Sequence, residues 1–168
     1  MTLSKIFTER IFRIPDYQRG YAWTQKEVSE FWNDLLRLNE NSNHYVGVLT
    51  LEPVKEDIYK TWIDDLWLID SKKYAPYYVV DGQQRLTTSI LLIKSIINVM
   101  KKHDIHQLNY TEISDISRRF ISESKGENKS CTYLFGYELN NPSYLYLTKK
   151  YMKITKMICS LCKKQRIH

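Results

Sequence analysis

The chain has 168 residues, 43% hydrophobic and 26% charged, which is enough for one globular domain with a real core. Its net charge of +6 comes from residues 149–168, where seven side chains are basic and none is acidic, leaving 18 basic and 19 acidic side chains in residues 1–148. The neutral core argues against strong DNA binding outside that tail, because such binding needs a basic surface.

Several classes of protein are excluded by simple features of the sequence. There is no uninterrupted apolar run of about 18 residues, and no apolar segment near the N-terminus that could act as a secretory signal. Three cysteines do not make a disulfide framework in a chain of this size. We therefore expect a cytoplasmic protein with no membrane partner.

The first recognisable segment is FRIPDYQRGYAW, residues 12–23, which is predicted to be extended or turned because Pro15 disfavours helix at Ile14. Its arginine could stack on a base or build a nucleotide pocket, or it could lie against neighbouring rings at a packed edge. Taken alone, the segment favours the packed edge. If the segment is extended, period two places four side chains on one face: Tyr17, Arg19, Tyr21 and Trp23.

A helix is predicted to begin at Thr24, because Thr24 and Glu27 have the spacing of a capping box. Its apolar side chains recur at helical spacing from Val28 to Leu38. HYVGVLTLE, residues 44–52, is typical of a strand, and a glycine within it indicates close approach by another group. The glycine is Gly47.

A strand over residues 77–80 and a helix over about 85–102 are the next clear predictions. TWIDDLWLID, within residues 53–76, fits either a short helix or a strand. Beyond the long helix we expect a polar loop at 122–130 and a strand at 131–140. Residues 141–168 are predicted to be a basic amphipathic helical tail.

The junction between the strand at 77–80 and the helix carries the sequence Asp81-Gly82-Gln83-Gln84-Arg85. A strand that feeds a glycine turn and then a helix is a recurrent phosphate-binding arrangement, since the first helical turn offers unpaired N–H groups. Arg85 would add donors matched to phosphate oxygens, and Asp81 could help hold hydrated Mg²⁺. Either glutamine could hold a water or a nucleotide edge, and Thr87 adds a hydroxyl. The alternative is a tight turn with solvated polar side chains.

Together, FRIPDYQRGYAW and VVDGQQRLTT resemble the N-terminal domain of GmrSD-type restriction proteins, within the wider ParB/sulfiredoxin-like fold group. The resemblance covers roughly residues 5–150, including HYVGVLTLE and the later segment FGYELNNPSYLYL. It implies an α+β fold, a small mixed sheet with flanking helices. The nucleotide-binding domain would span residues 1–140, followed by the start of a helical region at 141–168.

The same resemblance implies a Mg²⁺-dependent enzyme that binds and hydrolyses a nucleoside triphosphate, and so controls cleavage of modified DNA in anti-phage defence. Its catalytic residues would be Asp81, Gln84 and Arg85, with Asp81 serving the metal and Gln84 orienting the attacking water. Its nucleotide-binding residues would be Tyr17, Gln18, Arg19, Gly82, Gln83 and Thr87.

Two other functions stay open at the level of sequence. The chain could be a non-catalytic module that binds DNA or regulates a separate nuclease subunit, or it could be an inactive truncated remnant. No His-Asn-His nuclease pattern is visible in the 168 residues. The basic tail fits a nucleic-acid or membrane-surface helix, or the beginning of a helical region, and we favour the last because its apolar stripe needs something to pack on.

Overall fold

A four-stranded mixed sheet forms the centre of the protein in a computed structural model that describes residues 2–39, 42–126 and 131–147. Its strands lie in the order β2 (Thr50–Pro53), β3 (Ala75–Asp81), β1 (Arg10–Ile14) and β8 (Phe135–Tyr137). β1 runs parallel to both β3 and β8, whereas β2 is antiparallel to β3. The predicted α+β class, a small mixed sheet with flanking helices, is confirmed.

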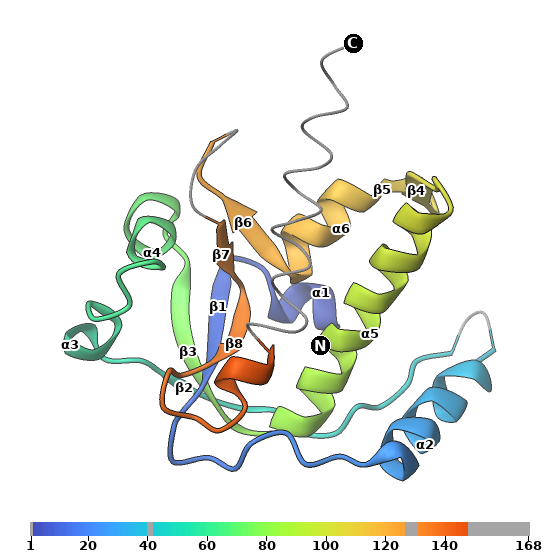
Figure 1. Ribbon diagram of the computed structural model, residues 1–168, viewed down its shortest axis with the longest axis horizontal. Coiled ribbons are helices and arrows are strands. Elements are labelled where there is room, and N and C mark those ends of the chain that lie inside the picture. Colours follow the sequence, from blue (N-terminus) through green and yellow to red (C-terminus); the bar gives the residue numbers. More distant parts are fainter. Residues whose placement is uncertain (1, 40–41, 127–130, 148–168) are drawn as a thin grey trace.

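Helices cover the sheet on both sides, as Figure 1 shows, with α3 and α4 to the left and α5, α6 and α1 to the right. The helices are α1 (Leu3–Ile6), α2 (Gln25–Leu36), α3 (Glu56–Tyr59), α4 (Leu66–Lys72), α5 (Gln83–Lys102) and α6 (Ile113–Phe120). Two small antiparallel sheets complete the described structure: β4 (Gln107–Leu108) with β5 (Thr111–Glu112), and β6 (Ser122–Ser124) with β7 (Cys131–Tyr133).

The core forms around β1, which lies between two other strands and is covered on both faces. Ile11, Phe12 and Ile14 are completely buried. They share one apolar cluster with the buried stripe of α5, which includes Ile90 and Ile97. The predicted helix over residues 85–102 is therefore confirmed, and its apolar face rests against the sheet.

Arg13 of β1 forms a buried ion pair with Asp65. Arg13 Nη2 is 2.5 Å from Asp65 Oδ2, at the start of α4, and both side chains are only 11% exposed. The same guanidinium donates to the carbonyl oxygens of Phe12 and Tyr133 and lies 5.5 Å from the ring of Trp62. These contacts compensate the loss of hydration that both charges suffer on burial.

Four local predictions need correction or refinement. The strand expected over 44–52 begins only at Thr50, and Gly47, with a φ of +88°, lies in the non-strand segment before it. The strand expected over 131–140 is divided between β7 and β8, which belong to different sheets. The polar loop expected over 122–130 begins with strand β6. For TWIDDLWLID the helix alternative is the correct one, because its second half forms α4, and a further short helix, α3, precedes it.

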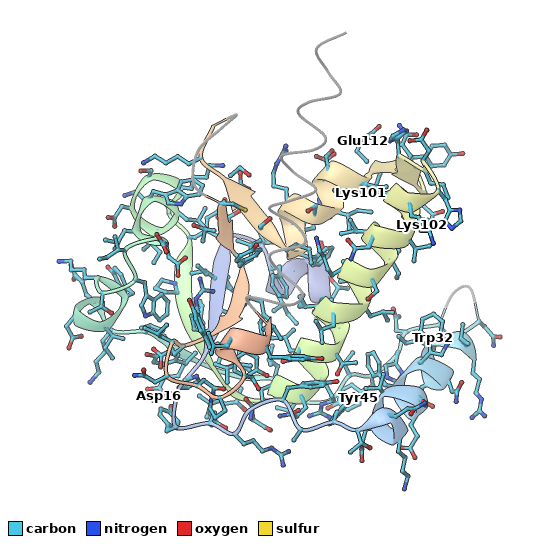
Figure 2. The ribbon with its side chains drawn as sticks, in the orientation of Figure 1. Asp16, Trp32, Tyr45, Lys101, Lys102 and Glu112 are labelled. Atoms are coloured by element: carbon cyan, nitrogen blue, oxygen red, sulfur yellow. The ribbon has the colours of Figure 1, made fainter. Side chains whose placement is uncertain are left out.

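The helix predicted at Thr24 is confirmed as α2, including both hydrogen bonds of its capping box. Only Phe31 of α2 is buried, however, so most of the predicted apolar face is not in the core. Figure 2 shows Trp32 on this helix, well away from the sheet, where the side chain is 43% exposed. The helix thus lies as an arm beside the domain.

Among the residues that the structure describes, no helix is both long enough and apolar enough to cross a membrane. The basic stretch 149–168, on which the predicted amphipathic tail depends, lies outside the described residues.

Candidate functional site

The carboxyl ends of three parallel strands meet at one edge of the sheet, the lower edge in Figure 1. β1 leads into the loop 15–24, β3 leads into Gly82 and α5, and β8 leads into residues 138–147. Figure 2 shows Asp16 at this edge. Ligands of open sheets commonly bind outside the carboxyl ends of parallel strands, so the topology itself brings the two sequence motifs to a plausible site.

The beginning of α5 has open backbone donors. Its N-cap residue, Gly82, has a φ of +84° and provides no side chain for capping. A Cβ at this position would lie 2.9 Å from the carbonyl oxygen of Val48, so glycine is required for both conformation and space. Asp81 Oδ1 accepts the Gly82 N–H at 2.7 Å. Gly82 makes no side-chain cap, so the first N–H groups of the helix give this end a partial positive charge.

Gln83 and Gln18 join the two motifs through their side-chain amides. Gln83 Nε2 donates to Gln18 Oε1 at 3.3 Å, and Gln18 Nε2 donates to the carbonyl oxygen of Val80 at 3.1 Å. Gln83 is only 6% exposed, yet its Oε1 has no hydrogen-bond partner among the described residues. A buried acceptor of this kind is costly unless something donates to it.

Gln84 fastens the loop of the first motif to α5. Its Nε2 donates to the carbonyl oxygen of Gly20 at 3.0 Å, and its Oε1 accepts the N–H of Ala22 at 2.8 Å. The side chain is 6% exposed. Both the donor and the acceptor of the Gln84 amide therefore bond to backbone groups of the loop, and Gln84 holds the loop against α5.

Arg85 lies against the segment that precedes β2. A Cβ added to Gly47 would stand 2.0 Å from Arg85 Nη1, which confirms the predicted close approach at this glycine. Within the described structure the guanidinium makes one hydrogen bond, a long one of 3.4 Å to the carbonyl oxygen of Val48. The remaining donors of this half-exposed side chain could therefore serve an anion.

Thr87 supports the site through buried hydrogen bonds. It is completely buried, donates to the carbonyl oxygen of Gln83 at 2.7 Å, and shares a 3.1 Å hydrogen bond with the hydroxyl of Tyr137. Burial raises the pKa of Tyr137 to about 12, although the hydrogen bond with Thr87 acts in the opposite direction. Thr88 in turn shares a 2.9 Å hydrogen bond with the Tyr21 hydroxyl.

The two remaining predicted residues lie in the loop between Pro15 and Ala22, and both are exposed. Arg19 is flanked by Gln18 and Gly20, which are bonded to the first turn of α5. Tyr17 is 70% exposed. Its pKa is raised, first by partial desolvation and then by nearby carboxylates, the largest of these contributions coming from Glu52.

Sequence reasoning missed two polar residues after β8. Asn141 and Ser143 are 3% and 8% exposed, and both bond to the backbone of the first motif. The signal available was a pair of small polar residues, spaced by one, directly after a predicted strand. By itself this pattern is also typical of an ordinary turn.

Among the described residues, no group of three histidine, cysteine, aspartate or glutamate side chains could hold a metal ion. Asp81 is the single predicted metal ligand, an exposed carboxylate at the end of β3. A protein cage for a metal is therefore not formed by this part of the chain. A carboxylate beside an uncapped helix start can still hold a hydrated cation jointly with phosphate oxygens.

Comparison with models of known families gives a match over residues 3–165 to the model described as GmrSD restriction endonuclease, N-terminal domain. This agrees with the resemblance found in the two motifs, and it extends that resemblance further towards the C-terminus. A search of curated proteins found no match.

Proposed function

The chain belongs to the family of GmrSD restriction endonuclease N-terminal domains and therefore to a restriction system, and we propose that it binds a nucleoside triphosphate at the start of α5 and hydrolyses it. The observation that carries this proposal is the junction of the two motifs: Gln84 bonds to Gly20 and Ala22, and Gln83 bonds to Gln18. Hydrolysis would control cleavage of modified DNA by a nuclease.

The residues at the junction fit a nucleotide in two ways. The uncapped N–H groups of α5 and the guanidinium of Arg85 suit phosphate oxygens, because both offer N–H donors near a positive helix end. The partnerless Oε1 of Gln83 needs an N–H or O–H donor, which ribose hydroxyls and base amino groups supply.

Mg²⁺ fits the same place as a cofactor that is bound mainly by the substrate. Asp81 would hold it by one carboxylate, with phosphates and water as its other ligands. When bound, the ion would neutralise charge on the phosphates. No other residue of the described chain is required to coordinate it.

Each side chain then has a distinct task. Arg85 clamps the phosphates and offsets the charge that develops as the terminal phosphoryl group leaves. Arg19 and Tyr17 close the site from the exposed side of the first motif. Gln84, whose amide is already engaged with backbone, acts by holding that motif against α5 rather than by orienting water.

The test uses purified protein with radiolabelled ATP, GTP, CTP and UTP in the presence of Mg²⁺. We expect at least one triphosphate to bind, to be hydrolysed, and to raise the unfolding temperature, because a ligand that binds the native state stabilises it. Arg85→Ala should abolish these effects. Arg37→Ala, an exposed arginine at the end of α2, is the matched control and should behave as wild type. Unchanged binding and hydrolysis by Arg85→Ala would refute the assigned site.

A further inference from the structure

The segment after β8 forms hydrogen bonds with the turn that carries Arg19. Asn141 Nδ2 donates to the carbonyl oxygens of Pro15 and Gln18, both at 2.9 Å. Its Oδ1 accepts the backbone N–H of Ser143 at 3.0 Å. The buried amide of Asn141 thus bridges the two ends of a tight turn, and the backbone of Ser143 holds that amide in place.

Ser143 fixes the other side of Arg19. Its Oγ accepts the N–H of Tyr21 at 2.7 Å. The contact is also tight sterically, since a Cβ added to Gly20 would stand 2.5 Å from the same oxygen. The loop can approach Ser143 this closely because residue 20 has no side chain.

The backbone next to Arg19 is therefore restrained on both sides, whereas the arginine side chain is exposed. Gln18 is held through its carbonyl oxygen by Asn141, Gly20 through its carbonyl oxygen by Gln84, and Tyr21 through its N–H by Ser143. Freely moving loops do not need buried amides and hydroxyls beneath them. Such support is what a functional side chain requires in order to keep one direction.

We propose that Asn141 and Ser143 are positioning residues for the nucleotide site, which hold the backbone around Arg19 and thereby fix where its guanidinium is presented. The inference rests on the proposed function, because its expected consequence is a change in nucleotide affinity. The restraint itself is a property of the free protein. Preorganisation of this kind raises affinity because the ligand does not have to order the loop.

The variants are Asn141→Asp, which replaces the donor by an oxygen facing two carbonyls, and Ser143→Ala, which removes the acceptor for Tyr21. Thr132→Val is the matched control. Thr132 is 1% exposed and bonds to Asp64 and Trp67, so this change removes buried hydrogen bonds away from the site. Should Asn141→Asp fail to fold, Ser143→Ala carries the test.

Amide hydrogen exchange of the free protein is the first measurement. We expect exchange in residues 16–23 to rise about tenfold or more in Asn141→Asp and Ser143→Ala, and to stay unchanged in Thr132→Val. Unchanged exchange in both site variants would overturn the proposal, whether or not the protein binds nucleotide.

Binding of radiolabelled ATP, GTP, CTP and UTP is the second measurement, made as a double-mutant cycle with Arg19→Ala. Ser143→Ala should weaken binding about tenfold in the wild-type background but less than about twofold when Arg19 is already alanine. An equal loss in both backgrounds would show general damage and overturn the positioning role. If wild-type protein binds none of the four triphosphates, the proposed function fails, and hydrogen exchange alone decides the restraint.

Discussion

The guanidinium of Arg85 occupies the space beside Gly47 in which a side chain would otherwise stand, with Nη1 2.0 Å from the position of a Cβ. The segment before β2 is therefore shaped around this arginine. A residue more than thirty positions earlier in the chain sets where the proposed phosphate-binding group can lie.

Gly47→Ala should move Arg85 and weaken nucleotide binding. The φ of +88° adds backbone strain of about 1–2 kcal/mol, and the new methyl group displaces the end of a flexible side chain rather than the core. Isothermal titration and thermal unfolding would separate the two effects. Gly126→Ala is the control, because Gly126 has a φ of +71° and nothing within 4 Å, so it carries strain without displacement. Wild-type affinity in Gly47→Ala would contradict the expectation.

Gln84→Glu should loosen the first motif from α5. The substitution keeps an acceptor for Ala22 but places a buried carboxylate oxygen against the carbonyl of Gly20. We expect a loss of about 1–3 kcal/mol in the free energy of unfolding, measured with urea. Gln25→Glu, at the exposed first position of α2, is the control and should not lower stability, because a negative charge there faces the positive end of the helix. Equal stability of the two variants would be inconsistent with the role assigned to Gln84.

Asp65→Asn should destabilise the whole fold without touching the proposed site. It leaves the Arg13 guanidinium buried and without its carboxylate, for which the expected cost is about 3–5 kcal/mol in the free energy of unfolding. Urea unfolding again measures the change. The comparison is Glu56→Gln, which breaks the exposed pair with Lys60 and should have no measurable effect.

Stability should fall at alkaline pH, in part through Tyr137. Its pKa is raised to about 12 by burial, so between pH 10 and 12 the unfolded chain loses this proton while the folded chain keeps it. The unfolded state then binds fewer protons, and the free energy of unfolding decreases by about 1.4 kcal/mol per pH unit from this group. Below pH 10 the contribution is fully present.

Tyr137→Phe should therefore flatten the stability profile above pH 10. At neutral pH it should cost about 0.5–1.5 kcal/mol, because the hydrogen bond with Thr87 is lost. Urea unfolding at several values between pH 8 and 11 tests both points. Tyr110→Phe, at a fully exposed position, should leave the slope as in wild type. An unaltered slope in Tyr137→Phe would count against the assignment.

The sequence was sufficient for the parts of this protein that depend on local pattern. The capping-box spacing of Thr24 and Glu27 predicted α2, and the apolar period from Leu86 predicted α5. The glycine at position 47 predicted a close approach by another group. Each of these signals lies within a few residues, and the structural cause acts over the same short distance.

Features that depend on partners far along the chain were not predictable in the same way. The ion pair of Arg13 with Asp65 joins residues 52 positions apart, and Asn141 reaches Pro15 across 126 positions. Nothing near any of these four residues indicates its partner. The division of residues 131–140 between two sheets has the same origin, since only strand pairing distinguishes the two halves.

The position of β8 has a consequence for the order in which the domain matures during synthesis. Both motifs have been translated once Thr88 has been added, but the residues that brace the first of them follow more than fifty positions later. A nascent chain that ends before Asn141 contains every group proposed to touch nucleotide, yet the turn bearing Arg19 still lacks its hydrogen bonds to Asn141 and Ser143. On the proposed function, full nucleotide affinity would therefore be gained only after residues 141–143 follow β8, the strand that pairs with β1.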